Sequence, residues 1–180
     1  MGAPLLEIHD LQKHFLVKKS FSAQNRVYLK AVDGVDLTME KGETIGLVGE
    51  SGCGKSTLGR TILKLHSVTG GQIVYEGKDI TKYTPGQMME YRRKMQLIFQ
   101  DPFASLNPRK TIMQSVEAPL DLSHDIPKAE RRERVIKMLD VVGLGEKYLN
   151  KYPHELSGGQ RQRIVIARAL INNPEMVVCD

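Results

Sequence analysis

The stretch with the clearest chemical potential is GESGCGKST, at residues 49–57. It fits G-x-x-x-x-G-K-[ST], a pattern typical of loops that wrap around a row of phosphates. Its glycines let the backbone turn so that successive N–H groups face anionic oxygens. Lys55 would bring a positive charge to the β- and γ-phosphates, and the Ser56 hydroxyl would bind Mg²⁺. The candidate phosphate site comprises Gly49, Glu50, Ser51, Gly52, Cys53, Gly54, Lys55, Ser56 and Thr57.

The sequence on both sides of this loop favours the same interpretation. Residues 45–48 are mostly apolar and predict a strand, and Leu58, Ile62 and Leu65 recur at helical spacing. A helix starting near Lys55 would add its unpaired N–H groups and the positive end of its dipole. The alternative is a glycine-rich turn before a lysine-containing helix, with no ligand. The strand–loop–helix context favours the phosphate site.

The other elements are predicted from apolar periodicity and turn residues. Residues 18–30 are mostly polar with scattered aromatics, which indicates a loop or a hairpin insertion. A Glu-Gly pair at 76–77 would close a hairpin between two strands. We expect strands at 6–11, 32–39, 72–75, 79–80, 95–99 and 176–179, and helices at 127–142 and 157–171.

Length and composition narrow the class of protein. A chain of 180 residues, 41% apolar and 26% charged, is long enough for one domain with a substantial core. No apolar run approaches the ~18 residues of a membrane-spanning helix, and the N-terminus lacks a secretory signal pattern, so we expect a cytosolic location. The two cysteines exclude a disulfide framework, and Cys179 lies in an apolar run where burial is expected. The net charge of +5 could attract nucleic acid, but the basic residues are dispersed, so no nucleic-acid partner is expected.

A second candidate anion site is the sequence LSGGQ at 156–160, just before a predicted helix. Ser157 and Gln160 have the spacing of a capping box, in which two side chains satisfy backbone N–H groups at a helix N-terminus. The alternative is that a serine, two glycines and a bare helix N-terminus bind a phosphate. From these residues alone the cap is favoured, because such caps are common.

LSGGQ also resembles the signature sequence of ATP-binding cassette (ABC) proteins, and it follows the phosphate loop in that family's order. The sequence IFQDP at 98–102 looks like the family's Q-loop, and MVVCD at 176–180 looks like its Walker B strand. Phe15 lies where the family places the aromatic that stacks on adenine, although a core role for Phe15 is equally open. Tyr28 is a weaker candidate for that stacking. The resemblance covers about residues 5–180.

The resemblance implies an α/β fold. Its core would be a P-loop NTPase of ABC ATPase type, with an antiparallel β subdomain and a helical (signature) subdomain at about 101–160. Residues 1–180 would form a single nucleotide-binding domain. The family's subunits act as head-to-tail pairs that hold ATP between them, so one chain's signature would face the γ-phosphate on the partner's loop. The signature residues are Leu156, Ser157, Gly158, Gly159 and Gln160.

The resemblance also assigns the catalytic and metal-binding residues. Gln100 would position the attacking water or Mg²⁺, and Asp180 would hold Mg²⁺ through water. The metal ligands would then be Ser56, Gln100 and Asp180, with ATP and Mg²⁺ as cofactors.

Within the family, the chain most resembles the ATP-binding subunits of bacterial dipeptide and oligopeptide importers, through residues 48–60 and 100–109. This implies an ATPase that energises peptide import and lies peripherally on the cytoplasmic face of the inner membrane. Its implied partners are transmembrane permease subunits, a second ATP-binding subunit of the same or another kind, and indirectly a periplasmic or extracellular peptide-binding protein. Nickel and glutathione importers are near relatives, so the cargo stays open.

The chain departs from the family pattern at its last residue, Asp180. The family places a catalytic glutamate directly after that aspartate, so we expect the domain to be incomplete at its C-terminus. Loss of a general base typically lowers the rate by about 10²–10⁴-fold. Two alternatives therefore stay open. One is a truncated nucleotide-binding fragment without effective hydrolysis, and the other is a soluble ABC protein acting on nucleic acid or ribosomes, which the sequence pI of 9.2 suggests.

Overall fold

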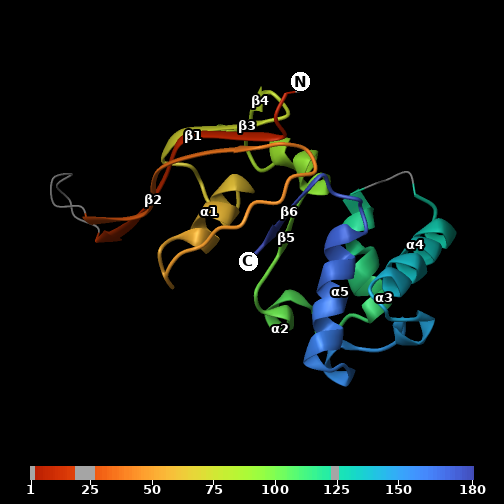
Figure 1. Ribbon diagram of the computed structural model, residues 1–180. Helices are drawn as coiled ribbons and strands as arrows, with labels where there is room; N and C mark the ends of the chain where they lie inside the picture. The colour runs from red at the N-terminus through yellow and green to blue at the C-terminus, as the bar shows by residue number, and fades with distance from the viewer. Residues whose placement is uncertain (1–2, 19–26, 123–125) are drawn as a thin grey trace. The chain divides into compact units, whose positions relative to one another are not determined.

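The computed structural model describes residues 3–18, 27–122 and 126–180 (Figure 1). They form two compact units, Met1–Met88 and Met89–Asp180. The first unit contains β1 (Leu6–Lys18), β2 (Val27–Met39), α1 (Lys55–Ile62), β3 (Gly70–Tyr75) and β4 (Lys78–Asp79). The second contains β5 (Met95–Ile98), α2 (Pro102–Ser105), α3 (Ile112–Glu117), α4 (Lys128–Val141), α5 (Gly158–Leu170) and β6 (Met176–Cys179). Short 3₁₀ turns occupy Gln87–Met89, Tyr91–Arg93, Ala118–Leu122, Glu146–Tyr148 and Pro153–Glu155.

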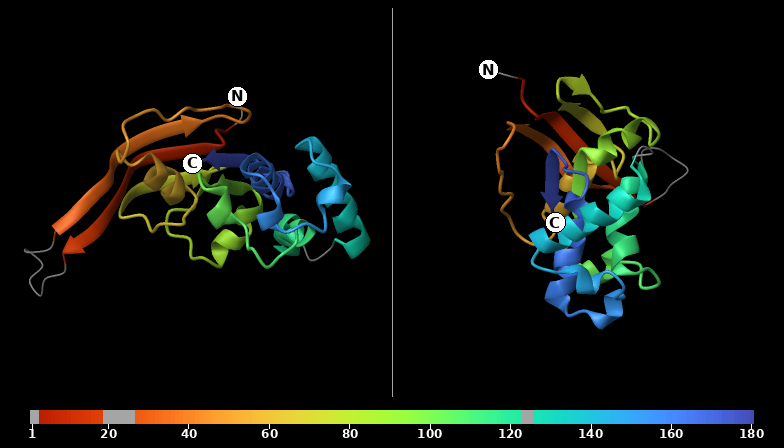
Figure 2. Two further views of the ribbon diagram at one scale, coloured as in Figure 1. Left: turned by 90° about the horizontal axis from the view of Figure 1, so that it is seen from below. Right: turned by 90° about the vertical axis from the view of Figure 1, so that its right-hand side faces the viewer.

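A four-stranded antiparallel sheet, in the order β2-β1-β3-β4, is the framework of the first unit. β1 and β2 run side by side along their whole length, from the pair Leu6–Met39 to the pair Lys18–Val27 (Figure 2). The strands predicted at 6–11 and 32–39 are confirmed, and both are longer than predicted. Part of the insertion predicted at 18–30 belongs to these strands, whereas 19–26 lies outside the described residues.

The hairpin predicted around residues 76–77 is confirmed. Tyr75 pairs with Lys78, so the turn between β3 and β4 has two central residues. Glu76 and Gly77 have φ angles of 47° and 74°. Positive φ at both positions defines a type I′ turn, whose twist matches that of the flanking strands.

The strand predicted at 45–48 is wrong for the part of the chain that the structure describes. Residues 43–50 have no regular secondary structure, and Val48 is 98% exposed. A strand is stable only when its N–H and C=O groups pair with a neighbour. Among the described residues, the two sheets contain only β1–β4 and β5–β6, so 45–48 has no such neighbour.

The second unit combines a parallel strand pair with a helical core. β5 and β6 pair from Met95–Met176 to Ile98–Cys179, which confirms the strands predicted at 95–99 and 176–179. Cys179 is exposed, so the expectation that it is buried is wrong. Helices α3, α4 and α5 pack against one another (Figure 1). The fully buried side chains of this core include Ile112, Val116, Leu120, Val135, Leu139 and Ile164.

The two long helices of this unit confirm the predictions at 127–142 and 157–171. α4 is flanked by Pro127 and Val142, and α5 by Ser157 and Ile171. The short helices α2 and α3 were not predicted, because one or two turns carry too little periodicity to be recognised. The described helices include none that is long and apolar enough to cross a membrane.

Helix α4 offers a direct test of this core. Leu139 is fully buried and Val141, two residues later on the same helix, is 74% exposed. We predict that Leu139→Ala lowers the free energy of unfolding by about 2–5 kcal/mol, because it leaves a cavity between α4 and its neighbours. Val141→Ala is the matched control, with an expected change within ~0.5 kcal/mol. Equal urea midpoints for the two variants would contradict the assigned packing.

Candidate nucleotide-binding site

The phosphate-loop residues lie in the first unit, where the loop rests against β2. Gly54 precedes α1 with a φ of 104°, a left-handed conformation that favours glycine. A Cβ at this position would lie 2.1 Å from the Ala31 carbonyl oxygen of β2. α1 begins at Lys55 and packs against β1 and β2 through a face that buries Leu58 and Ile62. The sheet therefore determines where the loop ends and where the helix N-terminus points.

Lys55 folds back over the loop. Its ammonium donates hydrogen bonds of 2.7 Å to both the Gly49 and Glu50 carbonyl oxygens and lies 3.6 Å from the Cys53 Sγ. These partners are exposed, and phosphate oxygens accept hydrogen bonds from an ammonium more strongly than neutral carbonyls do. The arrangement holds the ammonium at the loop, where it can donate its hydrogen bonds to an anionic ligand in place of the carbonyls.

A cavity of about 370 Å³ joins this loop to the β1–β2 hairpin. The loop and the start of α1 contribute residues 52–57 to its wall, and the strands contribute Phe15, Leu29, Lys30 and Ala31. The sequence had indicated Phe15 but not the three β2 residues, which belong to no motif. A prediction of how β1 pairs with β2 could have identified them, because that pairing places Leu29 opposite Phe15. Tyr28 is exposed and is not among the described residues that line the cavity.

Phe15 is half-buried, and its ring is held by two neighbours. The edge of the His66 ring packs against it, with 5.4 Å between ring centroids, and Lys13 Nζ lies 4.8 Å from its centroid. Burial, with the nearby charges of Lys13 and Arg60, lowers the pKa of His66. His66 is therefore neutral at neutral pH, which suits its apolar contact with Phe15. The ring thus forms part of the cavity wall.

In the second unit, LSGGQ begins α5, and the capping box is confirmed. Ser157 Oγ accepts from the Gln160 N–H at 3.3 Å, and Gln160 Oε1 accepts from the Ser157 N–H at 2.9 Å. Leu156 is buried, whereas Ser157, Gly158 and Gly159 are exposed. A Cβ on either glycine would meet no described atom within 4 Å. The first turn of α5 therefore presents an open surface.

Two arginines of α5 hold the segment that follows Gln100. Arg161 donates from Nε and Nη2 to the Leu156 carbonyl oxygen, at 2.9 and 2.7 Å, and its guanidinium lies 3.8 Å from the Phe103 ring centroid. Arg168 donates to the Ser105 carbonyl oxygen, and burial lowers the pKa of Arg168. Helix α2 is thereby fixed to the signature helix, a contact that no sequence pattern indicated.

Gln100 and Asp180 follow the carboxyl ends of two neighbouring parallel strands. The Asp180 N–H donates to the Ile98 carbonyl oxygen at 3.0 Å, and Gln100 lies two residues beyond Ile98. An amide and a carboxylate oxygen are ligands that suit Mg²⁺. Ser56, the third predicted ligand, belongs to the first unit. No cluster of three or more His, Cys, Asp or Glu side chains able to hold a metal occurs in the described ranges.

Comparisons with known proteins agree with these features. The ABC transporter family matches residues 32–180. The chain is 47% identical over 177 residues to the dipeptide transport ATP-binding protein DppF of Escherichia coli, covering 98% of this chain and 53% of that protein. It is 46% identical over 177 residues to the oligopeptide transport ATP-binding protein AppF of Bacillus subtilis, covering 98% and 54%.

A solved structure of a dimeric ATP-binding cassette, in a post-hydrolysis state with ADP and Pi, matches with a TM-score of 0.84 and 31% identity. That match covers 97% of this chain and 73% of the cassette. These findings confirm the predicted resemblance and the predicted α/β fold class. The chain spans about half the length of the curated relatives it matches. The individual site residues and the domain limits stay predictions.

The contact of the loop with β2 leads to a testable expectation. We predict that Gly54→Ala weakens ATP binding at least about tenfold more than Gly52→Ala, measured by titration calorimetry. Both glycines have positive φ, so both variants carry backbone strain, but only a Cβ at position 54 meets the β2 backbone. Similar affinities for the two variants would show that the loop does not depend on this contact.

Proposed function

Because the chain belongs to the ABC transporter family, we propose that it binds and hydrolyses ATP to energise import of peptides across the bacterial inner membrane. The cavity that joins Phe15 to the phosphate loop carries this proposal. The similarity to dipeptide and oligopeptide transport ATP-binding proteins supports the class of cargo. Its place would be the cytoplasmic face of the membrane, beside transmembrane permease subunits and, indirectly, a peptide-binding protein.

ATP would bind by exchanging hydrogen-bond partners. The Lys55 ammonium would leave the Gly49 and Glu50 carbonyls for the β- and γ-phosphates. Backbone N–H groups at the start of α1 would meet the same phosphates, helped by the helix dipole. The adenine would pack on Phe15 at the other end of the cavity.

Ser56, Gln100 and Asp180 would hold Mg²⁺ with a hydroxyl, an amide and a carboxylate oxygen. When bound, Mg²⁺ would supply positive charge beside the phosphates. Gln100 would in addition orient the attacking water. Gln100 is exposed, and helix α2, which follows it, is held by Arg161 and Arg168, so the amide is accessible next to a fixed segment.

Two ATP-binding subunits, identical or different, would pair so that LSGGQ of one faces the loop of the other. Ser157 is already the cap of α5, yet the exposed first turn leaves room for a phosphate beside Gly158 and Gly159. A helix N-terminus with exposed glycine N–H groups favours an anion. The cap and the γ-phosphate contact are therefore compatible roles of the same residues.

The first test removes the loop charge. We predict that Lys55→Ala lowers the affinity of the full-length protein for ATP by at least about a hundredfold, since it removes a charged hydrogen-bond donor from the phosphates. Lys78→Ala, which removes the same charge from an exposed position on β4, is the control and is expected to bind ATP normally. Unchanged ATP affinity in Lys55→Ala would contradict the proposed function.

The second test separates the two roles of Ser157. Aspartate caps helices as well as serine does, so Ser157→Asp is expected to keep the unfolding free energy, whereas Ser157→Ala loses about 1 kcal/mol. The new carboxylate would repel the γ-phosphate of the partner's nucleotide. We therefore predict at least about tenfold slower ATP turnover by the assembled importer with Ser157→Asp. Turnover equal to wild type would restrict Ser157 to its capping role.

A further inference from the structure

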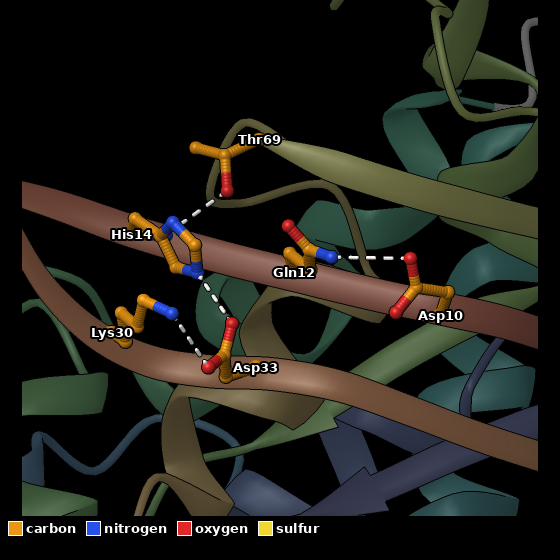
Figure 3. Close-up of polar contacts among 6 residues, drawn as sticks. All are labelled: Asp10, Gln12, His14, Lys30, Asp33 and Thr69. Atoms are coloured by element: carbon orange, nitrogen blue, oxygen red, sulfur yellow. Dashed lines mark hydrogen bonds and ion pairs between the residues drawn. The ribbon is translucent and has the colours of Figure 1, made fainter.

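The chain between α1 and β3 lies beside the part of β1 that carries Phe15. Thr69 makes the backbone contacts there. Its N–H donates to the Gln12 carbonyl oxygen at 2.9 Å, and its Oγ1 accepts from the His14 N–H at 3.0 Å (Figure 3). The His14 side chain contacts the neighbouring strand, because its Nε2 lies 3.0 Å from Asp33 Oδ1 of β2. This stretch of β1 is therefore held both by β2 and by the segment that follows α1.

Lys13 is a buried lysine in the same stretch, with 7% of its surface exposed. Its ammonium donates to Ser67 Oγ at 3.0 Å and lies over the Phe15 ring, 4.8 Å from the ring centroid. The negative face of an aromatic ring attracts a cation, and the attraction is stronger where water is excluded. Burial of the ammonium therefore strengthens its hold on the ring, and Ser67 fixes where the ammonium lies.

The neighbours of the Phe15 ring hold it from outside the loop cavity. Phe15 lines the cavity, whereas Lys13 and His66 are not among the described residues that line it. The His66 and Phe15 rings are nearly perpendicular, at 88°. A base that enters the cavity would thus meet a ring whose orientation is already fixed, and little conformational freedom would be lost on binding.

We propose that Lys13 is a positioning residue for nucleotide binding, whose buried ammonium, anchored to Ser67, holds the Phe15 ring in the orientation that receives the base. This inference rests on the proposed function, which places the adenine on Phe15. Lys13 acts through the ring and not on the phosphates. The two ends of the cavity are also linked, because Ser67 follows α1, whose first residues form the phosphate end.

The test measures how much the adenosine part adds to the affinity. Titration calorimetry of the full-length protein gives Kd for ATP and for tripolyphosphate, which has the phosphates without base or ribose. We expect Lys13→Met to lower the preference for ATP over tripolyphosphate roughly 3- to 10-fold, with tripolyphosphate binding unchanged, because the aliphatic part of the side chain is kept and only the ammonium is lost. Lys78→Met removes the same charge from an exposed position on β4 and is expected to change neither affinity.

Two further variants test whether Lys13 acts through the ring. Ser67→Ala removes the hydrogen-bond acceptor of the ammonium and is expected to lower the preference for ATP roughly 2- to 5-fold. In a Phe15→Leu background, Lys13→Met is expected to lower that preference no further, because the ring through which it acts is already gone. Should Lys13→Met fail to fold, Ser67→Ala decides by the same measurement.

Three outcomes overturn the inference. The first is an unchanged preference for ATP in Lys13→Met, or in Ser67→Ala where that variant decides. The second is an equal loss for ATP and tripolyphosphate, which would show a general effect of charge. The third is a further loss in the Phe15→Leu background, which would place the ammonium on the nucleotide itself. If the unaltered protein binds neither ligand, the proposed function fails as well; if it prefers ATP and Lys13→Met keeps that preference, only this inference fails.

Discussion

The close approach of Gly54 to β2 is the contact on which the proposed nucleotide site depends. A side chain at this position would lie 2.1 Å from the Ala31 oxygen, so the loop can lie against the strand only with glycine there. β2 is itself paired with β1 from Met39 to Val27, with several bulges, and this pairing holds the strand in place. The same contact therefore sets the start of α1, the position of Lys55 and the distance from the loop to Phe15.

The Lys55 ammonium follows a simple electrostatic principle. It donates to two exposed backbone carbonyls, so the charge already has oxygen partners at the loop. In the proposed nucleotide complex one oxygen would be exchanged for another, and no unpaired charge would have to be kept near the protein surface. Neutral carbonyls are weaker partners for an ammonium than phosphate oxygens, so they can be displaced.

Sequence patterns predicted the structure correctly where interactions between residues close in the chain determine it. The capping box of Ser157 and Gln160, the helix ends and the Glu76–Gly77 turn all depend on neighbours in the chain, and all were recognisable. Long-range partners were not: residues 45–48 have a strand pattern, but a strand forms only with a neighbour. Likewise, Leu29 joins the cavity wall through its pairing with Phe15, and Arg161 reaches Phe103 through the packing of α2 on α5. Side chains that meet by tertiary packing carry no spacing signal.

We propose that the loop and the edge of β2 form one nucleotide site. Hydrogen–deuterium exchange of the full-length protein, with and without ATP, tests it most directly. We expect slower exchange at the amides of residues 52–58 and 29–31 when ATP is present, with little change in β3 and β4. Slower exchange in the loop without any at 29–31 would separate the strand from the site. No change in the loop would contradict nucleotide binding there.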